Sequence, residues 1–351
     1  ENDLAALNWD DDSVDGHSHA DLLISGNFMA DFAVQAFVLD GNALWRGEDA
    51  AGNATFNSAT DSLAVVVIDG WSLSDDLRTA VAGDFVAGTI ADDAAPAWNV
   101  TAAVAGDVNG DGLDDVVFAD AGYISFAGSP DLGDTVLPNI GRAYVVTGRP
   151  TPPVDKLVFL GSDSELIVQD FSLGGSVAAL GDINFDGYDD FAVGRTQEGR
   201  QTASNDPTRE GGLLIYFGKA DWGSAHTVLR PADADITVRR DAAAAIPEGV
   251  VFNGALYATA GDLNADGKAD LIVGEPTRML TAANSTTVLD QDERGTTFVL
   301  FSITERGSDV ALTDASAAIR GEFEFDHFGT LPANPGIDID EDCDLICDDG
   351  P

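Results

Sequence analysis

The feature that most constrains this chain is an acidic loop that recurs in phase. Residues 105–119, 180–194 and 260–274 read AGDVNGDGLDDVVFA, LGDINFDGYDDFAVG and AGDLNADGKADLIVG. The first Asp of each loop falls at positions 107, 182 and 262, so successive copies lie 75 and 80 residues apart. A period of this length indicates one supersecondary unit per repeat, with each unit stacked on its neighbours.

Other segments keep the same phase. Each loop lies between two short apolar runs, and a Gly-led segment rich in β-branched and aromatic residues follows, from Gly141, Gly211 and Gly295. These segments predict about four short strands per repeat and an all-β fold. Four-stranded units of this size favour the radially arranged blades of a β-propeller. A string of separate sandwich domains is the alternative, and a β-solenoid is disfavoured because its repeats are much shorter.

Degenerate copies of the loop flank the three strong ones. Residues 10–21 carry extra residues inside the loop, and residues 338–344 form an acidic stretch of altered length that could instead belong to an unrelated calcium-loop tail. We therefore expect residues 1–351 to form a single repeat region with loops near 10–21, 107–115, 182–190, 262–270 and 338–344. The sequence leaves the blade number open, and also whether the two degenerate loops share the role of the three strong ones.

The strong loops read D-x-N-x-D-G-x-x-D, a pattern of oxygen donors that suits Ca²⁺. Side chains at positions 1, 3 and 5 can converge on one ion, position 7 offers its carbonyl, Gly at position 6 permits a sharp turn, and Asp at position 9 closes the site. We expect about three structural calcium ions, one per loop. The expected ligands are Asp107, Asn109, Asp111, the Leu113 carbonyl and Asp115; Asp182, Asn184, Asp186, the Tyr188 carbonyl and Asp190; and Asp262, Asn264, Asp266, the Lys268 carbonyl and Asp270.

The closing position separates these loops from an EF-hand. An EF-hand requires an acid at position 12, where this chain has Phe118, Val193 and Val273, so the loops are expected to join strands. Position 8 includes Ala269, which argues against an essential ligand there. A plain Asx-rich turn is the alternative for one isolated motif, and three copies in phase disfavour it. Mg²⁺ is disfavoured because it demands tight octahedral geometry.

The charge balance excludes several partners. The chain has 17 Lys and Arg against 61 Asp and Glu, a formal net charge of −44, so we expect no nucleic-acid binding. No apolar run approaches the roughly 18 residues needed to span a bilayer, so membrane insertion is not expected. Cys343 and Cys347 lie close together, and a bridge or two free thiols remain equally open. Because the chain starts at Glu1, we expect a processed form or a piece of a longer polypeptide.

With these residues in view, the chain resembles the FG-GAP repeats of integrin α-subunit propellers and their bacterial relatives. The Phe-Gly part survives as Phe252-Asn-Gly254 and Phe328-Gly329, and more loosely as Phe171-Ser-Leu-Gly174; the Gly-Ala-Pro part survives as Gly274-Glu-Pro276. The resemblance covers residues 98–330, and the termini by extension. It implies a propeller blade whose calcium loop lies in the hairpin between its first two strands.

The resemblance also implies a partner site on the face opposite the calcium loops. The corresponding segments are 120–140, 195–211 and 276–294, and the last two carry Arg195, Arg200, Arg209, Arg278 and Arg294. Ordinary solvated loops are the alternative.

We expect a calcium-stabilised extracellular module for binding or cell adhesion, secreted or at the cell surface, that recognises a protein or glycan. No nucleophile elbow or phosphate-binding loop is present in the sequence, so an enzyme is not expected. The alternatives are a structural component of a surface layer or filament that self-associates, and a propeller-based glycan-active enzyme.

Overall fold

The computed structural model describes fifteen parts of the chain, and almost everything in them is β-structure. The only described helices are two short 3-10 turns, η2 (Pro231–Asp233) and η3 (Leu312–Asp314). Among the described residues, no helix has the length and apolar character needed to cross a bilayer. The described parts are residues 3–7, 21–25, 34–39, 64–68, 100–120, 140–149, 157–159, 164–171, 173–195, 212–222, 227–239, 256–276, 295–303, 305–322 and 328.

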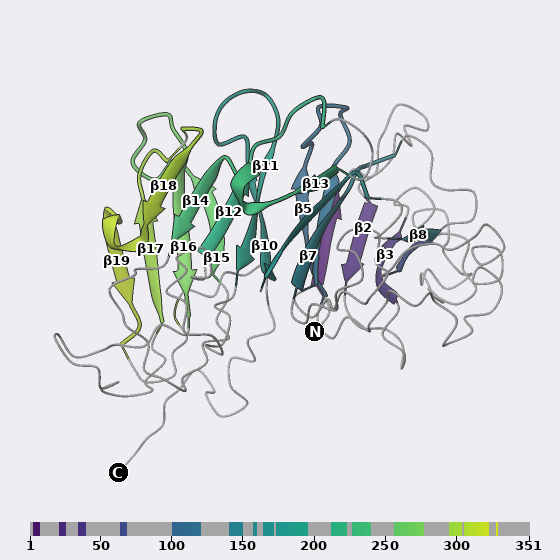
Figure 1. Ribbon diagram of the computed structural model, residues 1–351, viewed down its shortest axis with the longest axis horizontal. Helices are drawn as coiled ribbons and strands as arrows, with labels where there is room; N and C mark the ends of the chain where they lie inside the picture. The colour runs from purple at the N-terminus through teal and green to yellow at the C-terminus, as the bar shows by residue number, and fades with distance from the viewer. Residues whose placement is uncertain are drawn as a thin grey trace, which may run out of the picture.

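The described strands form four sheets that stand in a row, from the purple end to the yellow end of Figure 1. The first contains β1 (Asp3–Leu7), β2 (Asp21–Ser25), β3 (Val34–Leu39), β4 (Ala64–Ile68) and β8 (Leu157–Phe159). The second contains β5 (Val100–Gly106), β6 (Asp115–Asp120), β7 (Ile140–Val146), β9 (Leu166–Phe171) and β13 (Thr227–Leu229). The third contains β10 (Leu173–Gly181), β11 (Asp190–Arg195), β12 (Gly212–Tyr216), β14 (Ile236–Arg239) and β18 (Ser308–Ala311). The fourth contains β15 (Tyr257–Gly261), β16 (Asp270–Glu275), β17 (Thr296–Leu300) and β19 (Ala317–Arg320).

Within each sheet, the first four strands pair antiparallel in chain order, as expected for a propeller blade. The N-terminal degenerate copy follows the same plan, since β1 and β2 pair with Leu7 opposite Asp21. The prediction of an all-β fold built from propeller-type blades is therefore confirmed. We call these four sheets blades 1 to 4.

A fifth strand in three of the blades was not predicted. It comes from the next blade, from the segment between that blade's third and fourth strands, and it pairs parallel with the preceding blade's fourth strand. In this way β8 joins β4, β13 joins β9 and β18 joins β14. The expectation of four strands per repeat missed these exchanged strands because the pairing is made between repeats.

The hydrophobic cores lie between neighbouring blades. In β6, Val117 and Ala119 pack toward blade 3, whereas Val116 and Phe118 pack toward blade 1, and all four are buried. A strand covered on both faces reads as a continuous apolar run, which explains DVVFA and its counterparts in the other repeats. The first strands of successive blades also lie against one another, β1 against β5, β5 against β10 and β10 against β15.

Candidate functional site: three acidic loops

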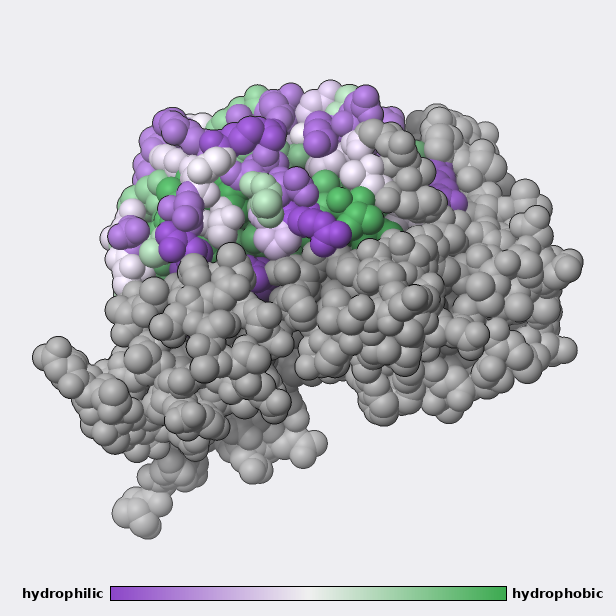
Figure 2. All heavy atoms as spheres, in the orientation of Figure 1, coloured by the Kyte–Doolittle hydropathy of each residue, from purple (hydrophilic) through white to green (hydrophobic). Residues whose placement is uncertain are grey.

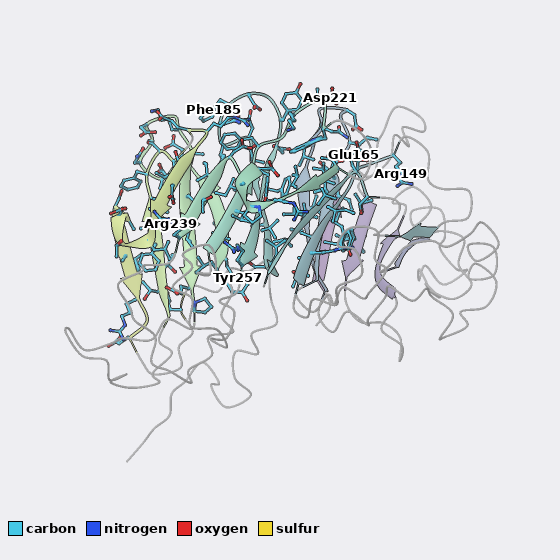
Figure 3. The ribbon with its side chains drawn as sticks, in the orientation of Figure 1. Arg149, Glu165, Phe185, Asp221, Arg239 and Tyr257 are labelled. Atoms are coloured by element: carbon cyan, nitrogen blue, oxygen red, sulfur yellow. The ribbon has the colours of Figure 1, made fainter. Side chains whose placement is uncertain are left out.

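Each strong acidic loop joins the first two strands of its blade, as predicted. The loops follow β5, β10 and β15 and lead into β6, β11 and β16. Phe185, at the tip of the second loop, lies at the top of the sheets in Figure 3, and Tyr257 lies at their opposite end. Hydrophilic residues, in purple, are frequent along the top of the described surface in Figure 2, with paler and green residues between them.

The carboxylate at position 1 closes each loop onto its own backbone. Asp107 Oδ1 accepts a hydrogen bond from the Asp111 N–H at 2.9 Å, and Oδ2 accepts one from the Gly112 N–H at 2.8 Å. Asp182 and Asp262 accept the same two bonds in their loops. The motif therefore imposes one conformation three times.

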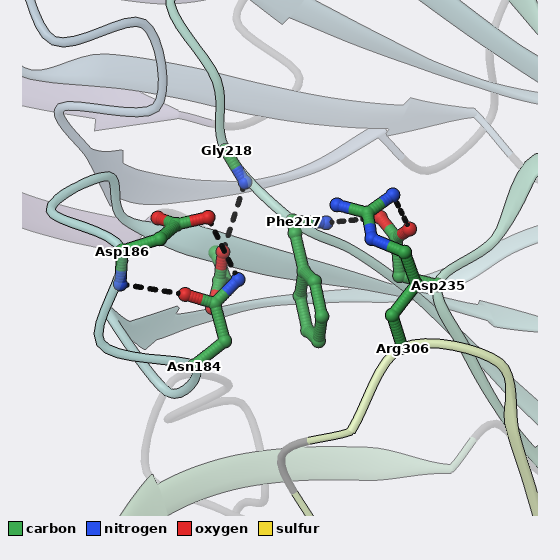
Figure 4. A network of polar contacts seen from close by, with 7 residues as sticks. Asn184, Asp186, Phe217, Gly218, Asp235 and Arg306 are labelled. Atoms are coloured by element: carbon green, nitrogen blue, oxygen red, sulfur yellow. Dashed lines mark hydrogen bonds and ion pairs between the residues drawn. The ribbon is translucent and has the colours of Figure 1, made fainter.

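Positions 3 and 5 are joined side chain to side chain. In the second loop, Asn184 Oδ1 accepts from the Asp186 N–H at 2.9 Å, and Asn184 Nδ2 donates to Asp186 Oδ2 at 2.9 Å (Figure 4). The backbone N–H of Tyr188, at position 7, donates to Asp186 Oδ1 at 3.2 Å. The first and third loops repeat these bonds.

Two loop positions adopt the left-handed backbone conformation. Position 6 is Gly112, Gly187 or Gly267, with φ of 90°, 93° and 79°, so the predicted sharp turn at glycine is present. Position 4 is also left-handed, and here the second and third loops use non-glycine residues, Phe185 at 62° and Ala265 at 60°. Such residues carry strain that the loop's hydrogen bonds offset.

The Asp at position 9 is fully buried in each of the three loops. Asp115 has no exposed surface; its Oδ2 accepts from the Val108 N–H at 2.9 Å and its Oδ1 from the Gly148 N–H at 2.8 Å. Asp190 and Asp270 are equally buried and make the corresponding pairs of bonds. Position 9 therefore ties the loop to the end of the blade's third strand, a role that the sequence analysis missed.

Burial makes two of these carboxylates reluctant to ionise. It raises the pKa of Asp115 to about 8, against the action of its two backbone hydrogen bonds, and the charges of Asp111 and Asp107 raise it further. Burial likewise raises the pKa of Asp190 to about 7, with Asp186 and Asp182 adding to the effect. A cation bound among these carboxylates would favour their ionised forms and would therefore lower the pKa values of Asp115 and Asp190.

The donors fit calcium chemistry, although they are not gathered on one point in this structure. Among the described residues, no group of three or more Asp, Glu, His or Cys side chains is arranged to hold a metal ion. Asp107, Asn109 and Asp111 instead direct their oxygens to loop N–H groups. Each loop does bring its five predicted residues into one turn, and all of the donors in that set are hard oxygens of the kind calcium prefers.

Position 8 of the second loop contacts the first loop. Asp189 Oδ2 accepts from the Asp107 N–H at 2.9 Å, and the Asp189 N–H donates to the Asp107 carbonyl at 3.1 Å. The Tyr188 ring lies against Gly110, where an added Cβ would come within 2.5 Å of Cε1. Asp189 and Tyr188 therefore join the second loop to the first.

Several predicted features lie outside the described residues. These are the degenerate loops at 10–21 and 338–344, the two cysteines, and Arg200, Arg209, Arg278 and Arg294. Arg195 is described, and it corrects one expectation: it ends β11 and is only 8% exposed, so it is not a surface charge on a partner-binding loop.

Comparisons with known proteins agree with this architecture. The FG-GAP repeat family matches residues 174–215 and 258–289, which contain the second and third acidic loops. Human phosphatidylinositol-glycan-specific phospholipase D is 30% identical over 184 residues, 51% of this chain and 18% of that protein. Integrin alpha-4 of Xenopus laevis is 33% identical over 118 residues, 34% of this chain and 9% of the integrin. The chain thus spans less than a fifth of either relative, and it contains FG-GAP repeats related to those of integrin α-subunits.

Proposed function

We propose that this chain is a calcium-stabilised extracellular binding module of the adhesion type, which recognises a protein or glycan partner. One observation carries the proposal: the same loop occurs three times. In each copy the Asp at position 9 is buried, and positions 1 and 5 of the same loop are also Asp. Such an arrangement is costly when the carboxylates are ionised without a counter-ion. The FG-GAP repeats and the similarity to integrin alpha-4 favour an adhesion-type role.

In each loop, calcium would be held by the side chains at positions 1, 3, 5 and 9 and the carbonyl at position 7. For the first loop these are Asp107, Asn109, Asp111, Asp115 and Leu113. In this structure the side-chain oxygens of these residues accept hydrogen bonds from backbone N–H groups. A bound ion would place its positive charge next to the same oxygens, and would replace or supplement those hydrogen bonds. Sites of this kind suit the millimolar calcium found outside cells.

For the partner, we propose the end of the blades opposite the acidic loops, the end at which Tyr257 lies in Figure 3. The loop end is rich in carboxylates, which would bind a neutral or acidic partner poorly unless calcium intervened. The opposite end is therefore the better surface for a protein or glycan.

We do not propose an enzymatic activity. The two carboxyls with raised pKa values, Asp115 and Asp190, have both oxygens engaged by backbone N–H groups, which suits a structural role better than proton transfer. The similarity to a phospholipase D concerns 18% of that protein, so its activity is not transferred to this chain.

Thermal unfolding with and without calcium tests the proposal. The metal-stripped chain should unfold at a markedly lower temperature than the chain in excess calcium, because an ion that binds only the folded state stabilises it by mass action. An unchanged unfolding temperature would contradict the proposal.

A matched pair of substitutions in the first loop makes the test specific. Asp111→Asn removes a charge at an expected ligand, and Asp114→Asn removes the same charge at position 8 of the same loop. The first should reduce the calcium-dependent shift in unfolding temperature, and the second should leave it nearly intact. Equal losses would indicate a general charge effect and no site.

A further inference from the structure

The first and second acidic loops are joined by a pair of hydrogen bonds between Asp107 and Asp189. The Asp189 N–H donates to the Asp107 carbonyl at 3.1 Å, and the Asp189 carboxylate accepts from the Asp107 N–H at 2.9 Å. Gly106 leaves room for this contact, because an added Cβ there would overlap Asp189 Oδ2. Position 1 of the first loop is therefore held by the backbone and the side chain of one residue in the second.

Two peptide groups connect an expected ligand of the second loop to an expected ligand of the first. The Tyr188 carbonyl, at position 7, belongs to the same peptide group as the Asp189 N–H that donates to the Asp107 carbonyl. That carbonyl belongs in turn to the peptide group whose N–H, on Val108, donates to Asp115 Oδ2 at 2.9 Å. Hydrogen bonds in such a chain polarise one another, so a charge that acts on one end strengthens the bonds along it.

A segment after β12 binds the same two loops. The Gly218 N–H donates to Asp190 Oδ1 of the second loop at 2.8 Å (Figure 4), and the Lys219 N–H donates to the Val108 carbonyl of the first at 2.9 Å. An added Cβ on Gly218 would come within 2.6 Å of the Tyr188 Cβ and 2.9 Å of the Val108 carbonyl oxygen. Because this segment is packed against both loops, a shift in one loop is opposed by its contacts with the other.

The second and third loops lack this connection. Position 8 of the third loop is Ala269, which packs against the apolar core between blades 3 and 4, and no hydrogen bond among the described residues joins the two loops. An added Cβ on Gly181, the counterpart of Gly106, would meet nothing within 4 Å. Phe185 holds the place of Gly110 and is 61% exposed, so no ring of the third loop covers it.

We propose that the first and second loops bind calcium as a cooperative pair, coupled through Asp189, and that the third loop binds it independently. This inference rests on the proposed function and adds a coupling between its sites. Ligation that orders the second loop also orders the Asp107 backbone, so the first loop has less conformational freedom left to lose when it binds its own ion. The Asp189 carboxylate lies at the contact between the loops and offsets part of the repulsion between two ions. The coupling is reciprocal, so each loop favours binding at the other by the same factor.

Calcium titration of the metal-stripped whole chain, followed by NMR with isotope-labelled glycine, tests the proposal loop by loop. The N–H groups of Gly112, Gly187 and Gly267 each donate to the position 1 carboxylate of their own loop, so each amide signal reports on one site. The Gly112 and Gly187 signals should respond together and over a narrower range of calcium concentration than the Gly267 signal.

A matched pair of variants measures the coupling. Asp186→Asn removes a ligand charge from the second loop and should weaken calcium binding at the first loop, read from Gly112, by about fivefold or more. Asp266→Asn removes the same charge from the third loop and should leave the Gly112 response unchanged. Equal effects of the two variants on the first loop would indicate a general charge effect and would overturn the proposal.

Asp189→Ala tests the contact itself while leaving every expected ligand in place. It should weaken binding at the first loop and reduce the further effect of Asp186→Asn there, as a double-mutant cycle measures. The Gly267 response should stay as in the parent, which shows that the variant folds. Asp314→Ala, which removes the same charge from an exposed residue of η3, is the matched control and should bind calcium like the parent.

The outcomes separate this proposal from the proposed function. Three glycine signals that respond to calcium independently, or full coupling in Asp189→Ala, would overturn the cooperative pair and leave the proposed function intact. No response of any of the three signals would contradict the proposed function and the pair together.

Discussion

The first and third acidic loops share their internal hydrogen bonds and differ in what surrounds them. In the first, Val108 is fully buried and its carbonyl accepts from the Lys219 N–H of the next blade at 2.9 Å. In the third, Leu263 holds the same position and is 54% exposed. The nine-residue motif therefore sets the loop's conformation by itself, whereas the neighbouring blade decides its burial and its electrostatics.

The largest expected effect is on pH dependence in the absence of metal. The folded pKa values of Asp115, about 8, and Asp190, about 7, exceed the ordinary value of 3.8, so the folded state retains protons that the unfolded chain loses. This stabilisation is complete below about pH 4 and is lost as the pH rises through 7 to 8.

Denaturant unfolding of metal-stripped protein between pH 5 and 8 measures this loss. For Asp115 the loss is on the order of several kcal/mol, because one unit of pKa shift corresponds to about 1.4 kcal/mol. Excess calcium should flatten the profile because the ion replaces the proton. A stability that rises with pH in the metal-stripped chain would contradict the burial argument.

The next effect compares the closing residues. Asp115→Ala leaves the buried N–H groups of Val108 and Gly148 without an acceptor and should lower the free energy of unfolding by about 2–5 kcal/mol. Asp270→Ala should cost less, because Leu263, one of its two donors, belongs to an exposed loop that water can reach. Equal losses in denaturant unfolding would show that the neighbouring blade does not matter.

Substitutions at position 2 compare how much apolar packing contributes to stability in the first and third loops. Val108→Ala removes two buried methyl groups from the core between blades 2 and 3 and should cost about 1–3 kcal/mol. Leu263→Ala should change the stability of the monomer by less than about 0.5 kcal/mol. If Leu263→Ala proved as costly at low protein concentration, residue 263 would have a partner within the same chain.

The smallest effect concerns position 4. Gly110→Ala places a Cβ at a φ of 78° and within 2.5 Å of the Tyr188 ring, so we expect a loss of about 1–2 kcal/mol. The third loop already has Ala265 at a φ of 60°, and Ala265→Gly should be nearly neutral. Tyr188→Ala should relieve part of the Gly110→Ala loss in a double-mutant cycle, and an additive result would show that the ring does not limit this position.

The sequence predicted what is local and missed what is made between repeats. The hairpins, the loop register and the turn at Gly112, Gly187 and Gly267 follow from residues a few positions apart, and the structure contains them. The exchanged strands depend on which repeat lies alongside, which no single repeat encodes. A signal was nevertheless present, since an Asp followed by Ser or Ala recurs before the fourth strand at 163, 233 and 314.

For the candidate ligands too, local geometry was predictable from the sequence, and contacts with distant residues were not. The spacing of Asp, Asn and Gly correctly placed the acidic residues of each loop in one turn. The spacing did not predict that the Asp115 carboxylate would accept hydrogen bonds from two backbone N–H groups. It also did not predict that the Asp189 carboxylate would accept a hydrogen bond, at 2.9 Å, from the Asp107 N–H of the preceding blade. Both contacts need residues that are distant in the sequence, Gly148 for the first and Asp107 for the second.

The central claim is that the three loops are calcium sites, and calorimetric titration of the metal-stripped chain with calcium tests it most directly. We expect saturation at about three ions per chain, one for each strong loop, with one site fewer in the Asp111→Asn variant. Any calcium bound by the degenerate loops would add to that number in the parent and the variant alike. Titration with no heat and no bound metal would mean that the loops are hydrogen-bonded turns alone, and the proposed function would fail with them.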